Sequence, residues 1–263
     1  MPKNEITNVS YNIPDHSNNR NMKDNHVRMK TQLNILRDLG HPVSPDSMVL
    51  DLGCGNGELV HEYLNKGYDA YGCDFSFKTG EFVEPLFAKG RIRKVDSNTY
   101  QLPFEDKSFD FVFTDQVFEH VKDYEGTLTE IKRVLKPGGV SLNFFPSRYQ
   151  IIEPHVYVPF ASINKNYYWL LLWALLGIRK RSQRGLSAKE TARSNYQYLN
   201  SSTFYLTKSE IENYCKNHFH KVIFAEGIFM RYLQRYRFIS VMSNTWLVAW
   251  LYRTFRHRVL VLH

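Results

Sequence analysis

Residues 49–58 read Val49-Leu50-Asp51-Leu52-Gly53-Cys54-Gly55-Asn56-Gly57-Glu58, and this stretch decides the fold of the 263-residue chain. A short apolar strand breaks into three glycines at alternate positions, and a helical pattern follows. Glycine is needed where the backbone turns sharply or approaches a ligand closely, because a Cβ would clash there. A glycine-rich loop that leaves a strand and opens a helix is typical of α/β sheets that hold a nucleotide-like cofactor. The spacing differs from the Gly-x-Gly-x-x-Gly of dinucleotide enzymes, which argues against a nicotinamide-dependent oxidoreductase.

Apolar segments alternate with helical patterns through the first half of the chain. We expect strands at residues 48–52, 68–73, 92–95, 109–114 and 140–145, and a helix from about 118 to 135. The alternation predicts an α/β fold, a Rossmann-like open sheet of about seven strands with helices on both faces. The pattern becomes irregular after residue 146, so we expect an insertion before the last two strands, which we place near 221–225 and 232–241.

Four carboxylates follow four successive predicted strands: Asp51, Asp74, Asp96 and Asp115. Ligands of an open parallel sheet bind at the carboxyl ends of its strands, near the point where the strand order reverses. A carboxylate after the second strand can accept both hydroxyls of a ribose, and the ring of Phe75 can cover an adenine. Each carboxylate alone reads as an ordinary turn or helix cap. Four of them in register predict a cofactor site.

In this order, the elements resemble class I S-adenosylmethionine-dependent methyltransferases, and most of all the subgroup called type 11. The resemblance spans about residues 45–146. Besides the glycines and carboxylates it includes Leu102-Pro103-Phe104, Ser108-Phe109-Asp110 and Leu135-Lys136-Pro137-Gly138-Gly139. It implies an enzyme that uses S-adenosyl-L-methionine as methyl donor, and a seven-stranded sheet whose last hairpin is reversed.

The resemblance also implies roles for single residues. The three glycines of the loop would line the amino-acid end of the cofactor, Asp74 would hold the ribose, Asp96 the adenine, and Gln116 would lie at the floor of the site. The cofactor-binding residues expected from the strand ends and from the resemblance are Asp51, Gly53, Cys54, Gly55, Gly57, Asp74, Phe75, Asp96, Ser97, Asp115 and Gln116.

Two histidines are candidates for the catalytic base. A sulfonium is already an activated methyl donor, so the protein has to align a nucleophile, exclude water and remove a proton. His120 follows the fourth strand and His155 follows the fifth, and an imidazole with a near-neutral pKa suits abstraction of a hydroxyl proton. Both also have structural readings, His120 as a helix residue and His155 as a loop residue bonded to the backbone.

The sequence around Glu119-His120 is similar to a known metal-binding pattern. Ubiquinone-pathway O-methyltransferases and small-RNA end methyltransferases resemble the chain there, and their Glu-x-x-Glu-His pattern holds a divalent ion. In this chain Gln116 stands at the first Glu. Because the loss of a carboxylate weakens a site for a hard cation, we expect no metal.

Charge is distributed unevenly along the chain. The net charge is +8, and residues 151–263 contain 16 Lys and Arg against 5 Asp and Glu. This asymmetry fits an anionic membrane surface, a phosphorylated substrate or nucleic acid, and equally a solubilising basic surface. Three widely spaced cysteines give no disulfide or zinc pattern, and the N-terminus has no apolar signal core. A cytoplasmic protein is therefore expected.

Two apolar, aromatic segments at residues 167–178 and 246–252 are each followed by basic residues. They are too short to span a bilayer, which takes about 20 residues. Apolar, Trp- and Tyr-rich segments beside basic clusters fit a peripheral position at the inner membrane surface. They also fit a lid over an apolar pocket, internal packing or a dimer interface.

We expect four regions: an N-terminal arm and helix at 1–44, an S-adenosylmethionine-binding core at 45–146, a substrate-side insertion at 147–208, and the last strands with a basic aromatic tail at 209–263. The expected function is methyl transfer by in-line displacement to a hydroxyl of a small molecule, sugar or lipid-linked acceptor. A nucleic-acid methyltransferase is an alternative, although the fourth strand lacks the Asn/Asp-Pro-Pro-aromatic sequence of amino-group enzymes. The other alternative is a non-catalytic, membrane-docked protein that binds S-adenosylmethionine. The sequence leaves O-, N- and C-methylation open.

Overall fold

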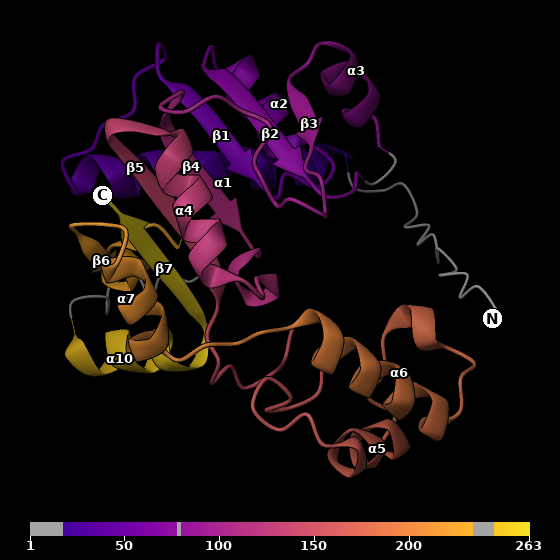
Figure 1. Cartoon of the computed structure of the whole chain (residues 1–263). Coiled ribbons are helices and arrows are strands. Elements are labelled where there is room, and N and C mark those ends of the chain that lie inside the picture. The colour runs from indigo at the N-terminus through magenta and orange to yellow at the C-terminus, as the bar shows by residue number, and fades with distance from the viewer. Residues whose placement is uncertain (1–17, 78–79, 234–244) are drawn as a thin grey trace.

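A single seven-stranded sheet organises the molecule, which the computed structural model describes for residues 18–77, 80–233 and 245–263. Its strand order is β3-β2-β1-β4-β5-β7-β6 (Figure 1). The strands are β1 Met48–Leu52, β2 Asp69–Asp74, β3 Ile92–Lys94, β4 Phe109–Asp115, β5 Leu135–Pro146, β6 Val222–Phe224 and β7 His257–Leu262. The first five run parallel, and β7 is antiparallel to both β5 and β6. The predicted fold class is confirmed.

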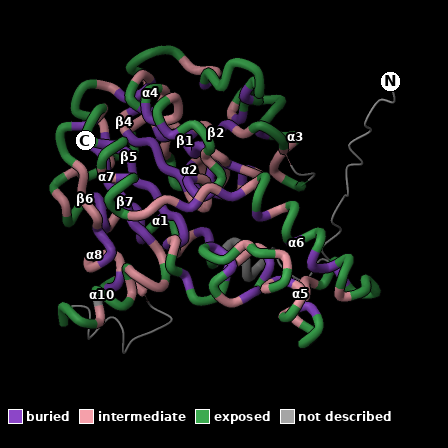
Figure 2. Tube along the Cα trace, turned by 60° about the horizontal axis from the view of Figure 1, so that its bottom comes forward, coloured by how far each residue is buried: buried purple, intermediate pink, exposed green. Residues whose placement is uncertain are grey.

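Helices cover both faces of the sheet because successive strand side chains point to opposite sides. The covering helices are α1 Asn18–Asp38, α2 Glu58–Asn65, α4 Tyr124–Val134, α7 Lys208–Lys216 and α8 Glu226–Arg231, and the short α3 Val83–Ala88 precedes β3. Phe111 and Phe113 of β4 pack with α1, α2 and α8 on one face, and Val112 packs with α4 and α7 on the other. Most residues of the central strands β1, β4 and β5 are buried (Figure 2).

The insertion forms a small unit of its own between β5 and α7. It contains α5 Tyr167–Leu175, the short 3₁₀ helix η2 Arg181–Gln183 and α6 Ala188–Ser202. Figure 1 shows α5 and α6 set apart from the sheet, on the side where β4 ends. Its apolar cluster is separate from the sheet core and consists of Val156, Val158, Ala161, Leu170, Ala192 and Leu199.

The segment after β4 differs from the single helix expected over 118–135. A 3₁₀ turn, η1 Phe118–His120, is followed by α4, which begins at Tyr124. Asp123 caps α4, because its side chain accepts a hydrogen bond of 2.9 Å from the backbone N–H of Gly126. The break leaves Glu119 and His120 in a turn at the carboxyl end of β4.

The strand that completes the sheet was expected near 232–241 and lies instead at His257–Leu262. Residues 234–241 lie outside the described residues. Helix α10, Trp246–Phe255, precedes β7, so the region expected as a basic tail ends in a buried strand. The sequence was misleading because Arg258 lies inside that strand. It is 7% exposed and pairs with Glu226 of α8 at 3.5 Å.

Replacing Glu226 by Ala is expected to lower the free energy of unfolding by about 3–5 kcal/mol, because Arg258 would then be a buried charge without its partner. Chemical denaturation of the full chain measures the change. The matched control is Glu212→Ala, which removes an exposed i,i+4 pair with Lys216 and should cost less than about 1 kcal/mol. Equal effects of the two substitutions would contradict the role given to the buried pair.

Candidate functional site

The glycine loop is tightly packed on one side and open on the other. Gly53 has φ +85°, and a Cβ there would lie 2.3 Å from Cγ2 of Val117, so no side chain fits. Gly55 has φ +56°, and a Cβ built on it meets nothing within 4 Å. The N–H groups of Gly53 and Cys54 both donate to the carbonyl of Cys73, at 2.8 and 3.1 Å. The loop is therefore fixed to β2, with its Gly55 side open to a ligand.

Asp74 lies opposite this loop at the end of β2. Its Oδ2 accepts a 2.8 Å hydrogen bond from the N–H of Gly55, and its Oδ1 accepts one of 3.3 Å from the N–H of Ser76. The next residue, Phe75, is 46% exposed, and its ring contacts that of Tyr100 edge-to-face at 5.3 Å. The structure thus brings a carboxylate and an exposed aromatic ring to the open side of the loop.

Asp51 and Cys54 are buried below the loop rather than exposed at its surface. Burial raises the pKa of Asp51 well above its usual value, Arg28 opposes that rise, and Asp115 adds to it. Burial also raises the pKa of the Cys54 thiol, whose side chain lies where a Cβ on Gly72 would stand. Both residues support the loop from beneath.

Asp115 ends β4 and forms an ion pair with Arg28 of α1. A hydrogen bond links the same helix to α2: Nδ2 of Asn25 in α1 donates to Oε2 of Glu58 in α2 at 2.8 Å. Sequence reasoning did not single out Arg28, because an arginine on an amphipathic helix carries no signal of the long-range pair. Gln116 follows with φ +59°, which is uncommon for a residue with a side chain, and its N–H donates to the carbonyl of Phe144 at 2.8 Å.

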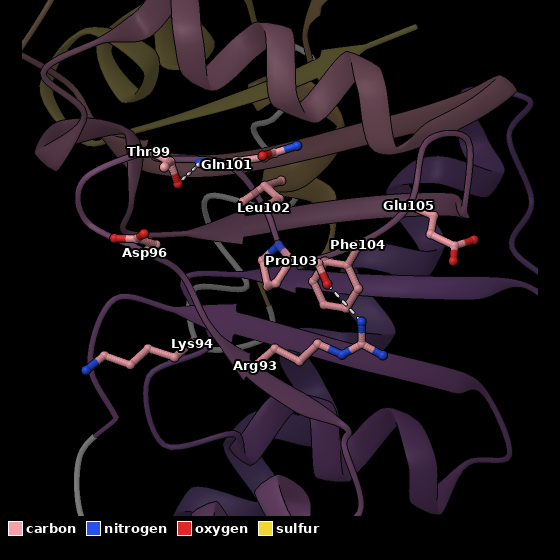
Figure 3. A pocket seen from close by; sticks show the side chains of 9 residues that line it. All are labelled: Arg93, Lys94, Asp96, Thr99, Gln101, Leu102, Pro103, Phe104 and Glu105. Carbon is pink, nitrogen blue, oxygen red and sulfur yellow. Dashed lines mark hydrogen bonds between the residues drawn. The ribbon is translucent and has the colours of Figure 1, made fainter.

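Asp96 and Ser97 are exposed after β3, where Oδ1 of Asp96 accepts from the N–H of Asn98 at 2.8 Å. Asp96 lines a hollow of about 430 Å³ between β3 and the chain that leads to β4. Figure 3 shows Asp96 and Thr99 at one end of this hollow and Arg93 beside Phe104 at the other. Asp96 is the only one of the predicted cofactor residues that lines it, so the hollow meets the expected site at the adenine end alone.

His155 is oriented by a buried carboxylate. Its Nδ1 lies 2.7 Å from Oε1 of Glu153, which also accepts from the hydroxyl of Tyr205 at 2.7 Å. Oε2 of Glu153 accepts the backbone N–H groups of His155 and Val156. Burial would raise the pKa of Glu153, but the hydrogen bonds from His155 and Tyr205 hold it below its usual value. His155 is thus bonded through its ring to an ionised carboxylate, and not to a backbone carbonyl.

His120 and His155 lie together, with ring centroids 4.8 Å apart and planes at 72°. Nδ1 of His120 lies 2.6 Å from the carbonyl oxygen of Ser202, at the end of α6. Burial lowers the pKa of His120, and the neighbouring His155 lowers it further. Because Nδ1 of each ring is engaged, Nε2 is the nitrogen that each histidine can offer to another group.

Glu119 lies beside this pair and is 1% exposed. Neither of its carboxyl oxygens has a hydrogen-bond partner among the described residues. Burial raises the pKa of Glu119 to about 8, and Asp115 and Glu153 add to the rise. The sequence pointed to this residue only as part of a broken metal pattern. Its isolation from other polar groups depends on the tertiary fold.

Comparison with known proteins agrees with the fold and the loop. Residues 50–142 match a family described as a methyltransferase domain. Demethylmenaquinone methyltransferase of Geobacillus kaustophilus is 32% identical over 120 residues, which are 43% of this chain and 50% of that protein. Sterol 24-C-methyltransferase ERG6B of Gibberella zeae is 32% identical over 103 residues, 37% of this chain and 27% of that protein. The chain thus spans half or less of the length of these two relatives.

A similar solved structure is a phosphoethanolamine N-methyltransferase 2 of Haemonchus contortus, in complex with phosphomonomethylethanolamine and S-adenosylhomocysteine. It superposes with a TM-score of 0.50 at 17% identity, over 89% of this chain and 51% of that one, so the likeness concerns the fold alone. The matched segment, the strand order and the glycine loop lead to one family. Over residues 50–142 the chain carries a methyltransferase domain of the class I S-adenosylmethionine-dependent type.

Proposed function

We propose that this protein transfers a methyl group from S-adenosyl-L-methionine to a hydroxyl of a small-molecule, sugar or lipid-linked acceptor. The observation that carries the proposal is the meeting of His120 and His155 at the end of β4, on the edge of the sheet where the glycine loop lies. A hydroxyl has to lose a proton when its oxygen is methylated, whereas a neutral amine already presents a lone pair. A pair of oriented imidazoles therefore favours a hydroxyl acceptor.

The loop and its neighbours fit the proposed methyl donor. The open side of Gly55 leaves room for a ligand. The Asp74 carboxylate beside it is held in position by two backbone N–H groups, and a carboxylate after the second strand can accept hydrogen bonds from ribose hydroxyls. The exposed ring of Phe75 supports stacking on the adenine, and the exposed carboxylate of Asp96 supports a hydrogen bond from the adenine amino group. When bound, the cofactor supplies a sulfonium methyl, which is already activated for in-line displacement.

The chain's own contribution lies in orientation and proton removal. Glu153 holds the ring of His155, and the carbonyl of Ser202 holds the ring of His120, so both rings are fixed before an acceptor arrives. The Nε2 edges would receive the acceptor hydroxyl and assist the loss of its proton. Arg28 would place α1 beside the site through its pair with Asp115.

Replacing Asp74 by Ala is expected to weaken S-adenosylmethionine binding by roughly tenfold or more, because a charge-assisted hydrogen bond to the ribose is worth about 1.5–3 kcal/mol. Titration calorimetry on the full chain measures the change. Asp46→Ala, at an exposed carboxylate before β1, is the control and should leave the affinity unchanged. An unaltered affinity in Asp74→Ala would show that this carboxylate does not hold the cofactor.

Replacing His155 by Ala is expected to lower turnover by about 10²–10⁴-fold while S-adenosylmethionine affinity stays within a factor of two or so. Transfer of labelled methyl groups to an acceptor pool from a cell extract measures turnover. His218→Ala is the control, since His218 pairs with Glu125 on α4, whereas His120 and His155 contact each other. Full activity in His155→Ala would remove the histidine pair from the mechanism.

We further propose that the acceptor is reached at an anionic membrane surface. Large apolar side chains are exposed on both α5 and α10, with Tyr168 at 76%, Leu175 at 68% and Trp246 at 78%. Exposed arginines lie close to both helices: Arg181 and Arg184 follow α5, whereas Arg253 is in the last turn of α10 and Arg256 follows it. The two helices lie at the same side of the molecule in Figure 1 and Figure 2. Among the described residues, no helix combines the length and apolar character needed to cross a bilayer.

Vesicle co-sedimentation tests this surface. We expect the protein to bind vesicles that contain anionic phospholipid and to be released by salt, because apolar insertion and basic attraction act together. The double variant Leu175→Ser, Trp246→Ser should lose binding, whereas Phe87→Ser, at a 56% exposed apolar residue on α3, should retain it. Equal partitioning of the double variant and the wild type would rule these helices out as the docking surface.

A further inference from the structure

Three side chains from two separate segments converge at the end of β4. Glu119 and His120 belong to η1, and His155 comes from the loop after β5. Each offers one metal-ligating atom, and these atoms all lie within 4.8 Å of one another. Bond lengths of about 2.0–2.2 Å place the ligands of one cation roughly 3–4 Å apart, so small side-chain shifts are enough to close the cluster on an ion.

The carboxyl group of Glu119 is buried without a hydrogen-bond partner among the described residues. It is 1% exposed, and both of its oxygens lack hydrogen bonds among the described residues. Buried polar atoms are almost always paired, and an exception calls for an explanation such as a bound ion. A cation between Glu119 and the two imidazoles would supply the missing interaction.

Hydrogen bonds to Nδ1 orient both histidines as metal ligands. Nδ1 of His120 is bonded to the carbonyl of Ser202, and Nδ1 of His155 to the carboxylate of Glu153. A metal-binding histidine commonly donates its other ring N–H to a carbonyl or carboxylate, which fixes the tautomer and raises the basicity of the ligating nitrogen. Both rings show this arrangement, and Nε2 of each remains for the ion.

We propose that Glu119, His120 and His155 bind one divalent transition-metal cation. Two imidazoles and one carboxylate favour Zn²⁺, Mn²⁺ or Fe²⁺ over Mg²⁺ and Ca²⁺, which take oxygen ligands. The expectation of no metal depended on Gln116, but the fold supplies His155 from a distant part of the sequence instead.

This inference rests on the proposed function and deepens it. Three protein ligands leave coordination positions open, and the acceptor hydroxyl is the group expected there. With the ion bound, Nε2 of both histidines would be ligands and would no longer act on the hydroxyl directly. Coordination would instead lower the pKa of the acceptor hydroxyl, and its proton would pass to solvent water. The oxygen then forms its bond to the methyl carbon, while the electron pair of the broken carbon–sulfur bond goes to sulfur.

Calorimetric titration of the chelator-treated full chain with MnCl₂, ZnCl₂ and MgCl₂ tests the site. We expect Mn²⁺ or Zn²⁺ to bind at one site per chain and more tightly than Mg²⁺. Glu119→Gln and His155→Gln should each weaken this binding at least about tenfold, as loss of one of three ligands requires. Glu125→Gln, at an exposed carboxylate on α4, should bind as the wild type does, and thermal unfolding shows whether each variant is folded.

Absence of Mn²⁺ and Zn²⁺ binding, or equal binding by wild type and a folded Glu119→Gln variant, would overturn the inference. Its failure is distinguishable from failure of the proposed function. Methyl transfer that continues in excess chelator would reject the cation and keep the methyltransferase. Cation binding at the cluster without any methyl transfer would keep the cation site and reject the methyltransferase.

Discussion

The close approach of Gly53 to Val117 is the constraint on which the site depends. With only 2.3 Å between a Cβ position on Gly53 and Cγ2 of Val117, the loop after β1 and the turn after β4 can pass each other only if residue 53 has no side chain. This crossing lies where the strand order reverses between β1 and β4. It fixes the open face of Gly55, where the proposed cofactor would bind, and through η1 the positions of Glu119 and His120, which the proposal assigns to the acceptor.

Contacts between the insertion and the turn after β4 position the two histidines. The carbonyl of Glu119 accepts the N–H of Phe204 at 2.7 Å, and the carbonyl of Ser202 holds the ring of His120. The same unit provides His155 and the buried Glu153. In the proposed function, cofactor binding would therefore fall to the sheet, and activation of the acceptor to the place where the insertion meets the sheet.

Local signals were enough to predict the parallel part of the sheet. The apolar run at residues 109–114 predicts a buried strand from local sequence alone, and the glycines of the loop predict a turn in the same way. The position of β7 could not be predicted, because Arg258 reads as a surface charge until Glu226 is known to lie against it. Both histidines were visible in the sequence, but their contact was not. The ion pair between Arg28 and Asp115 could not be predicted either. Both the histidine contact and this ion pair depend on tertiary packing between segments far apart in the chain.

Incubation of the full chain with isotope-labelled S-adenosylmethionine and a lipid-containing cell extract tests the central claim most directly. The identity of the labelled product is read by mass spectrometry and NMR. The account predicts a labelled methyl group on an acceptor oxygen, formed together with S-adenosylhomocysteine. Measurable cofactor binding without any labelled product, or a methyl group found on nitrogen or carbon, would contradict it.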